Sequence, residues 1–280
     1  AWQYATNTYN PVQEARNNAM QERKNVPLII DLADKYSIPI TWLTVGHLLL
    51  ENCKKLDGKT HPNLPRLNHF KNEFWDFSYG DWFKNDPGSS YQKSPEWYCP
   101  DLIQKILNAK TNHEIGCHTF SHIDCRNSVC PPDTFRAEIE ECAKAADKYG
   151  IKLKSFVHPA HTIGNLDKLE SLGFTSFRTD YDNYLGKPIN YKNHLWELKT
   201  SMPIYYRKEW SLNYHFFRYK KVVEKAIKNN ALCVMWFHPS EDQKFIRNVL
   251  SKLFDYLNNQ RDKALITTTS DYIDWLNNKM

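Results

Sequence analysis

Short apolar runs alternate with amphipathic stretches along most of the chain. Runs with the length and composition of buried strands occupy residues 38–45, 153–157, 174–178, 231–237 and 264–268. Between and after them, apolar residues recur at helical spacing in residues 133–150, 219–228, 245–254 and 271–276. This alternation is typical of a parallel sheet covered by helices. The pattern therefore predicts an α/β fold with a mainly parallel sheet or barrel.

Two segments have features of their own. The first predicted helix begins at Asn25–Pro27, because asparagine is a favourable N-cap and proline fits the first turn. The segment from about 54 to 100 has little periodicity but many aromatic residues, and so long a stretch is usually functional or disordered. It is too aromatic for disorder. Either a lid that stacks on sugar rings or an insertion with a small core of its own fits this composition.

Composition excludes several classes of protein. The nine glycines are not spaced as in a dinucleotide site, a phosphate-binding loop or the nucleophile turn of a serine hydrolase. The net charge is +5 without a basic tract, which speaks against a nucleic-acid partner, and no apolar run is long enough to span a membrane. Seven cysteines, an odd number, and the lack of a signal segment lead us to expect reduced thiols in the cytoplasm.

Histidine offers the clearest candidate chemistry. His118 and His122 are four residues apart, so both imidazoles can face one point and bind zinc or a similar divalent ion. Cys125 and Cys130 follow closely, and a closed four-ligand zinc site with the two histidines is an alternative. A third possibility is that the histidines are hydrogen-bonded polar residues at a strand end.

The flanking residues favour one interpretation. The sequence resembles the polysaccharide deacetylase family (NodB homology, carbohydrate esterase family four), whose second motif is matched by His118-Thr-Phe-Ser-His122. Further similarities, in the family's order, are found in 38–47, 112–116, 155–159 and 237–239. The resemblance implies one domain over residues 1–280, a distorted (β/α) barrel with the aromatic insertion at about 54–100. It also implies a site at the carboxyl ends of the strands.

The resemblance also implies a reaction. The chain would be a hydrolase that removes N-acetyl groups from a sugar or glycan, with one divalent metal ion, expected to be zinc, held by His118 and His122. His238 would be the general acid that protonates the leaving amine. Within the same class, a ring or amide hydrolase acting on a small nitrogenous substrate is a variant. We expect Trp75, Trp82 and Trp97 of the insertion to contact the sugar.

Two departures from the family pattern bear on activity. The family's first motif carries adjacent acidic residues, but residues 1–9 contain no carboxylate, so the first strand is expected to be largely missing. Those acids would lie just before residue 1 or be lost. The third motif lacks its arginine, and His158 or His161 would partly replace that charge. The alternative function is a catalytically degenerate carbohydrate-binding protein on the same fold.

Overall fold

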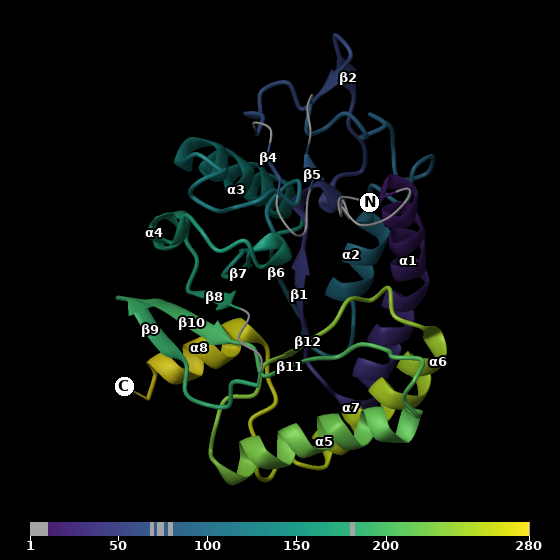
Figure 1. Ribbon diagram of the computed structural model, residues 1–280, viewed down its shortest axis with the longest axis vertical. Helices are drawn as coiled ribbons and strands as arrows, with labels where there is room; N and C mark the ends of the chain where they lie inside the picture. The colour runs from purple at the N-terminus through teal and green to yellow at the C-terminus, as the bar shows by residue number, and fades with distance from the viewer. Residues whose placement is uncertain (1–10, 68–69, 72–75, 78–80, 180–182, 280) are drawn as a thin grey trace.

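A computed structural model describes residues 11–67, 70–71, 76–77, 81–179 and 183–279. Its central sheet has six strands in the order β1-β6-β7-β8-β10-β9. Every pair is parallel except β10 with β9, so the expected α/β fold with a mainly parallel sheet is confirmed. The pair β11–β12 is also parallel and lies beyond the central sheet (Figure 1). Residues 1–10, where the first family strand was expected, lie outside the described residues.

The central strands are short, and the predicted strands 38–45, 153–157, 174–178 and 231–237 each begin before the observed one. The strands are β1 (Thr41–Thr44), β6 (Glu114–Cys117), β7 (Ser155–Val157), β8 (Ser176–Thr179), β9 (Ile189–Lys192), β10 (Leu195–Lys199), β11 (Met202–Pro203) and β12 (Met235–Trp236). Only β12 is observed of the predicted strand 231–237, and along this pair the N–H groups of Met202 and Ile204 donate to Val234 O and Trp236 O, at 3.4 and 2.8 Å.

Helices pack on both sides of the sheet (Figure 1). They are α1 (Pro11–Tyr36), α2 (Pro100–Leu107), α3 (Pro132–Asp147), α4 (Leu166–Leu169), α5 (Leu212–Lys228), α6 (Gln243–Phe245), α7 (Ser251–Asn258) and α8 (Thr269–Asn277), with short helical turns at Gly46–Leu49 (η1), Pro159–His161 (η2), Glu170–Leu172 (η3) and Ile246–Leu250 (η4). Among the described residues, none of these helices is long and apolar enough to cross a membrane.

Two expectations about the elements are wrong. Pro27 does not lie at the start of the first helix: α1 runs from Pro11 to Tyr36, and Pro27 lies inside it. Asn25 is not its cap but a buried side chain whose amide donates to the carbonyls of Pro239 and Glu241, each at 2.7 Å. Residues 264–268 form no strand; Thr269 N–H instead donates to the hydroxyl of Thr41 at 2.9 Å, which fixes the segment through a side chain.

The aromatic insertion carries the hairpins β2 (Lys55–Leu56) with β3 (Lys59–Thr60) and β4 (Phe70–Lys71) with β5 (Asp76–Phe77). It lies beyond the carboxyl end of β1 (Figure 1). Trp82 and Trp97 are 3% and 0% exposed and join one apolar cluster with Phe120 and Phe135. The core of the insertion is therefore continuous with the core beside α3, rather than separate from it.

Candidate active site

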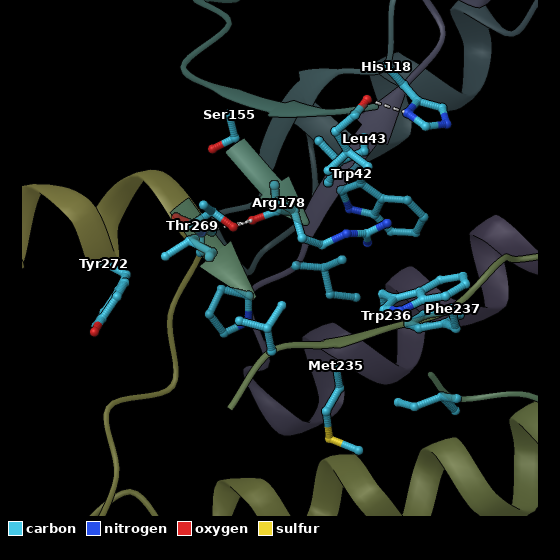
Figure 2. A pocket seen from close by; sticks show the side chains of 18 of the residues that line it. Trp42, Leu43, His118, Ser155, Arg178, Met235, Trp236, Phe237, Thr269 and Tyr272 are labelled. Carbon is cyan, nitrogen blue, oxygen red and sulfur yellow. Dashed lines mark hydrogen bonds between the residues drawn. The ribbon is translucent and has the colours of Figure 1, made fainter. Parts of the chain in front are cut away.

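A single cavity of about 1220 Å³ collects the histidines that follow the parallel strands. His118 and His122 follow β6, His158 and His161 follow β7, and His238 follows β12. Figure 2 shows His118 and Arg178 at this pocket, with Trp236 in its wall. Side chains from distant parts of the sequence meet here because the carboxyl ends of parallel strands share one edge of the sheet.

The loop 118–122 is bent by two residues with left-handed backbone. Thr119 has φ 58° and His122 has φ 59°, a conformation that non-glycine residues rarely adopt. The N–H of His118 donates to Thr44 O at 3.1 Å, and the N–H of Gly46 donates to Thr119 O at 2.8 Å. This backbone brings the His118 and His122 rings to a centroid distance of 4.9 Å at an interplanar angle of 71°.

The two imidazoles have the form that a metal ion requires. His118 Nδ1 lies 2.7 Å from Val157 O, and because a carbonyl can only accept, Nδ1 carries the proton and Nε2 keeps its lone pair. This contact is the usual orienting bond of a metal-binding histidine. Burial, then His122, lowers the pKa of His118 well below its ordinary value, and burial, then His238, lowers the pKa of His122 to about 3. Both rings are therefore neutral and able to bind a divalent ion.

The ligand set around these two histidines is incomplete among the described residues. No third His, Cys, Asp or Glu atom of the described ranges converges with theirs on one point. Cys125 and Cys130 are buried free thiols in the apolar cluster, which does not support a closed four-ligand site with the two histidines.

His238 lies across the cavity and is open to it. Its ring stands edge-on to Trp236, with the centroids 5.4 Å apart. Although the ring is accessible from the cavity, desolvation by the surrounding walls lowers its pKa, and the positive Arg178 adds to that effect. The carbonyl of the next residue, Pro239, accepts from Asn25, so α1 anchors the loop that carries His238.

The geometry does not support the expectation that His158 replaces the charge of the family's arginine. His158 is 1% exposed, and its Nε2 donates to Gly164 O at 3.0 Å, so its proton holds the loop 158–164. Burial lowers its pKa to about 4, which leaves it uncharged near neutral pH. His161 instead packs on Trp236 at a centroid distance of 5.5 Å and lines the cavity.

Arg178 is a cavity residue that sequence reasoning missed. It lies in β8, and its guanidinium carbon is 5.0 Å from the centroid of the Trp236 ring (Figure 2). Its fixed charge lowers the pKa values of His118, His158 and His238. The available signal was its position at the carboxyl end of the predicted strand 174–178, where side chains of a parallel sheet reach a site.

The tryptophans expected to contact a sugar do not line this cavity. Trp82 donates its Nε1 proton to Ser121, and Trp97 is fully buried, so neither ring offers a face for stacking. Trp75 lies outside the described residues. The aromatic rings that do face the cavity include Trp42 of β1 and Trp236 of β12 (Figure 2).

Comparison with known proteins agrees with this arrangement. A structure of a putative polysaccharide deacetylase from Mycobacterium smegmatis is similar over 92% of this chain and 79% of its own, with 13% identity and a TM-score of 0.62. A probable polysaccharide deacetylase from Pseudomonas aeruginosa PAO1 is similar over 89% of this chain and 71% of its own, with 12% identity and a TM-score of 0.56. No curated protein sequence matches the chain. The polysaccharide deacetylase family model matches residues 17–175, more than half of the sequence, and the chain belongs to that family.

Proposed function

We propose that this protein is a metal-dependent hydrolase that removes N-linked acyl groups, acetyl in the first place, from a carbohydrate. The observation that carries the proposal is the meeting of His118 and His122 at one cavity with His238. Family membership supports a carbohydrate substrate. The size of the cavity, about 1220 Å³, fits a sugar-sized ligand.

His118 and His122 would hold one divalent ion, and zinc suits two neutral imidazoles. When bound, such an ion polarises the amide carbonyl and lowers the pKa of a water molecule. The hydrogen bond from His118 Nδ1 to Val157 O orients its ring, and the strained backbone at Thr119 and His122 sets the position of the second ring.

His238 would donate a proton to the leaving nitrogen. Its ring is accessible from the cavity, as a proton donor to a bound substrate must be. Arg178 would hold negative charge that develops on the substrate oxygen, because its guanidinium faces the same cavity. His158 would support the wall of the site through its bond to Gly164 O.

The second candidate is a carbohydrate-binding protein that has lost catalysis. It is favoured by one observation: in the described ranges, no carboxylate joins His118 and His122 as a third ligand or base. The two candidates differ in whether acetate is released from a bound sugar.

The test compares the wild-type protein with His118→Ala/His122→Ala on chitooligosaccharides. We expect the double variant to lose one equivalent of divalent metal and to release acetate at least about 100-fold more slowly. His194→Ala, an exposed histidine outside the cavity, is the matched control and should keep both properties. Glycan binding by metal-loaded wild type without acetate release would favour the binding protein instead.

A further inference from the structure

A second group of ligand-type side chains lies between the insertion and the turn after β1. His47, Cys53, His61 and Asp86 each offer one ligand atom, and all four atoms lie within 4.8 Å of one another. We call these four residues the His47 cluster. None of them lines the cavity of His118 and His122. His47 belongs to η1, which follows β1, and the other three residues come from the insertion and its edge.

Four of the distances within the His47 cluster lie close to the edge length of a coordination tetrahedron. His47 Nε2 and His61 Nε2 lie 3.1 and 3.2 Å from the same carboxylate oxygen, Asp86 Oδ2. Cys53 Sγ lies 3.4 Å from that oxygen and 3.8 Å from His47 Nε2. In tetrahedral zinc sites, bonds of about 2.0–2.3 Å place neighbouring ligand atoms about 3.3–3.7 Å apart. The four atoms are thus already spaced around a position that one ion fills.

Without a metal ion, the His47 cluster has too few protons to make a hydrogen bond at each of its close nitrogen–oxygen contacts. His47 is fully buried, and its Nδ1 lies 3.0 Å from Trp97 O while its Nε2 faces Asp86. A neutral imidazole has one N–H, so one of these two acceptors faces a lone pair, and full burial disfavours a second proton. His61 Nε2 is buried against the same carboxylate without the geometry of a hydrogen bond. A cation on Asp86 Oδ2 removes both conflicts.

Outer contacts orient the ligands as in known metal centres. Trp97 O accepts the Nδ1 proton of His47 and turns its Nε2 toward Asp86 Oδ2. The other carboxylate oxygen, Asp86 Oδ1, accepts from Gly88 N–H at 3.0 Å, which leaves Oδ2 for the ion. Four protein ligands around a buried point leave no open position for substrate, as in structural rather than catalytic zinc sites.

We propose that His47, Cys53, His61 and Asp86 bind one zinc ion that holds the insertion against η1, the turn after β1. On binding, the S–H bond of Cys53 breaks, the sulfur binds the ion, and the proton passes to solvent. One thiolate, one carboxylate and two neutral imidazoles balance the charge of the ion, so the buried complex is neutral. Mixed nitrogen and sulfur ligands in a closed tetrahedron select zinc over magnesium or calcium.

The site also supports the candidate active site. Phe120, within the loop 118–122, packs against both His47 and His61, with ring centroids 5.6 and 5.0 Å away. The N–H of His47 donates to Phe120 O at 2.9 Å. Through Phe120, the ion would therefore stabilise the loop 118–122, which carries His118 and His122.

Cobalt substitution gives a test that does not depend on catalysis. We expect the full chain, stripped of metal and reloaded with Co²⁺, to show sulfur-to-cobalt charge-transfer absorption and the intense visible bands of a tetrahedral site. The thiolate absorption separates this site from His118 and His122, which have no sulfur ligand near enough to share. It should persist in His118→Ala/His122→Ala, which retains one equivalent of zinc whatever becomes of the proposed hydrolase activity.

Variants assign the ligands. Cys53→Ser should lose the charge-transfer absorption, and Asp86→Asn should bind zinc at least about 100-fold more weakly. Cys99→Ser, another half-buried free thiol, is the matched control and should keep the wild-type spectrum. Wild-type protein without thiolate absorption, or absorption that survives in Cys53→Ser, would overturn the proposal. If the variants do not fold, the wild-type spectrum and the zinc content of His118→Ala/His122→Ala decide the question.

Discussion

Glu138 is a buried carboxyl group beside the candidate active site. It is 2% exposed, and it accepts from the backbone N–H and the hydroxyl of Ser121, each at 2.8 Å. Burial raises its pKa from 4.5 to about 7, although the bonds from Ser121 oppose the shift. The folded protein therefore binds this proton more tightly than the unfolded chain does.

The stability of the protein should fall as pH rises from about 4.5 to about 7, through Glu138. In this window the folded state holds more protons than the unfolded state, so the free energy of unfolding decreases with pH, by up to about 3 kcal/mol in total. Glu138→Gln, which is neutral at every pH, should lose this dependence. Urea unfolding at several pH values measures it, and Glu140→Gln, on the exposed side of α3, is the matched control. Parallel curves for wild type and Glu138→Gln would contradict the assignment.

At the same scale, the sequence reveals some site residues and hides others. His118 and His122 could be found because their short spacing places them on one tight loop, and His238 because it directly follows an apolar run. The His47 cluster could not, because its residues are separated by 6, 8 and 25 positions along an aperiodic segment. Only the packing of the insertion on the turn after β1 brings its four atoms together.

At the scale of elements, apolar patterning predicted strands where β1, β7, β8 and β12 form, but not their bounds, and it placed a strand at 264–268 where none forms. Periodicity correctly predicted a strand at β1 and a helix at α3, because their buried faces are continuous. It failed at Pro27, where local propensity favoured a helix start. Val26, Ile29 and Ala33 form an apolar face that packs in the core, and this packing stabilises α1 on both sides of Pro27.

Gly46 tests the contact between two elements, η1 and α3. A Cβ at Gly46 would lie 2.7 Å from Cys142 Sγ and 2.9 Å from both Cα and Cβ of Cys142. We expect Gly46→Ala to lower the free energy of unfolding by about 1–3 kcal/mol, because α3 must move away from η1. Urea denaturation measures the change.

Two further variants separate the steric contact with Cys142 from the backbone strain that an alanine introduces at a glycine position. Gly46→Ala/Cys142→Ala should not regain stability, because the Cα and Cβ of residue 142 remain in the way. Gly58→Ala has open space around it but φ +77°, and should cost only about 1 kcal/mol, from backbone strain alone. Recovery in the double variant would show that only the sulfur atom crowds Gly46.

At the scale of the whole molecule, α1 meets the loop after β12 beside the candidate active site. Asn25 of α1 is fully buried, and its Nδ2 atom donates to Pro239 O and Glu241 O, more than 200 residues away. These bonds fix the segment that directly follows His238. The cavity is thus completed by the association of α1 with the loop after β12, rather than by either half of the sheet alone.

Asn25→Ala should therefore affect stability and the proposed activity together. Loss of the amide leaves two carbonyls without their donor, which should cost about 1–3 kcal/mol of unfolding free energy. If His238 is the general acid, its displacement should lower kcat about 10- to 100-fold while KM and the metal content stay close to wild type. Asn17→Ala removes an exposed asparagine of the same helix and is the control.

A variant that loses stability but keeps kcat would show that α1 stabilises the fold without positioning His238. An unchanged free energy of unfolding would instead mean that water replaces the amide, because a solvated loop satisfies its carbonyls without Asn25.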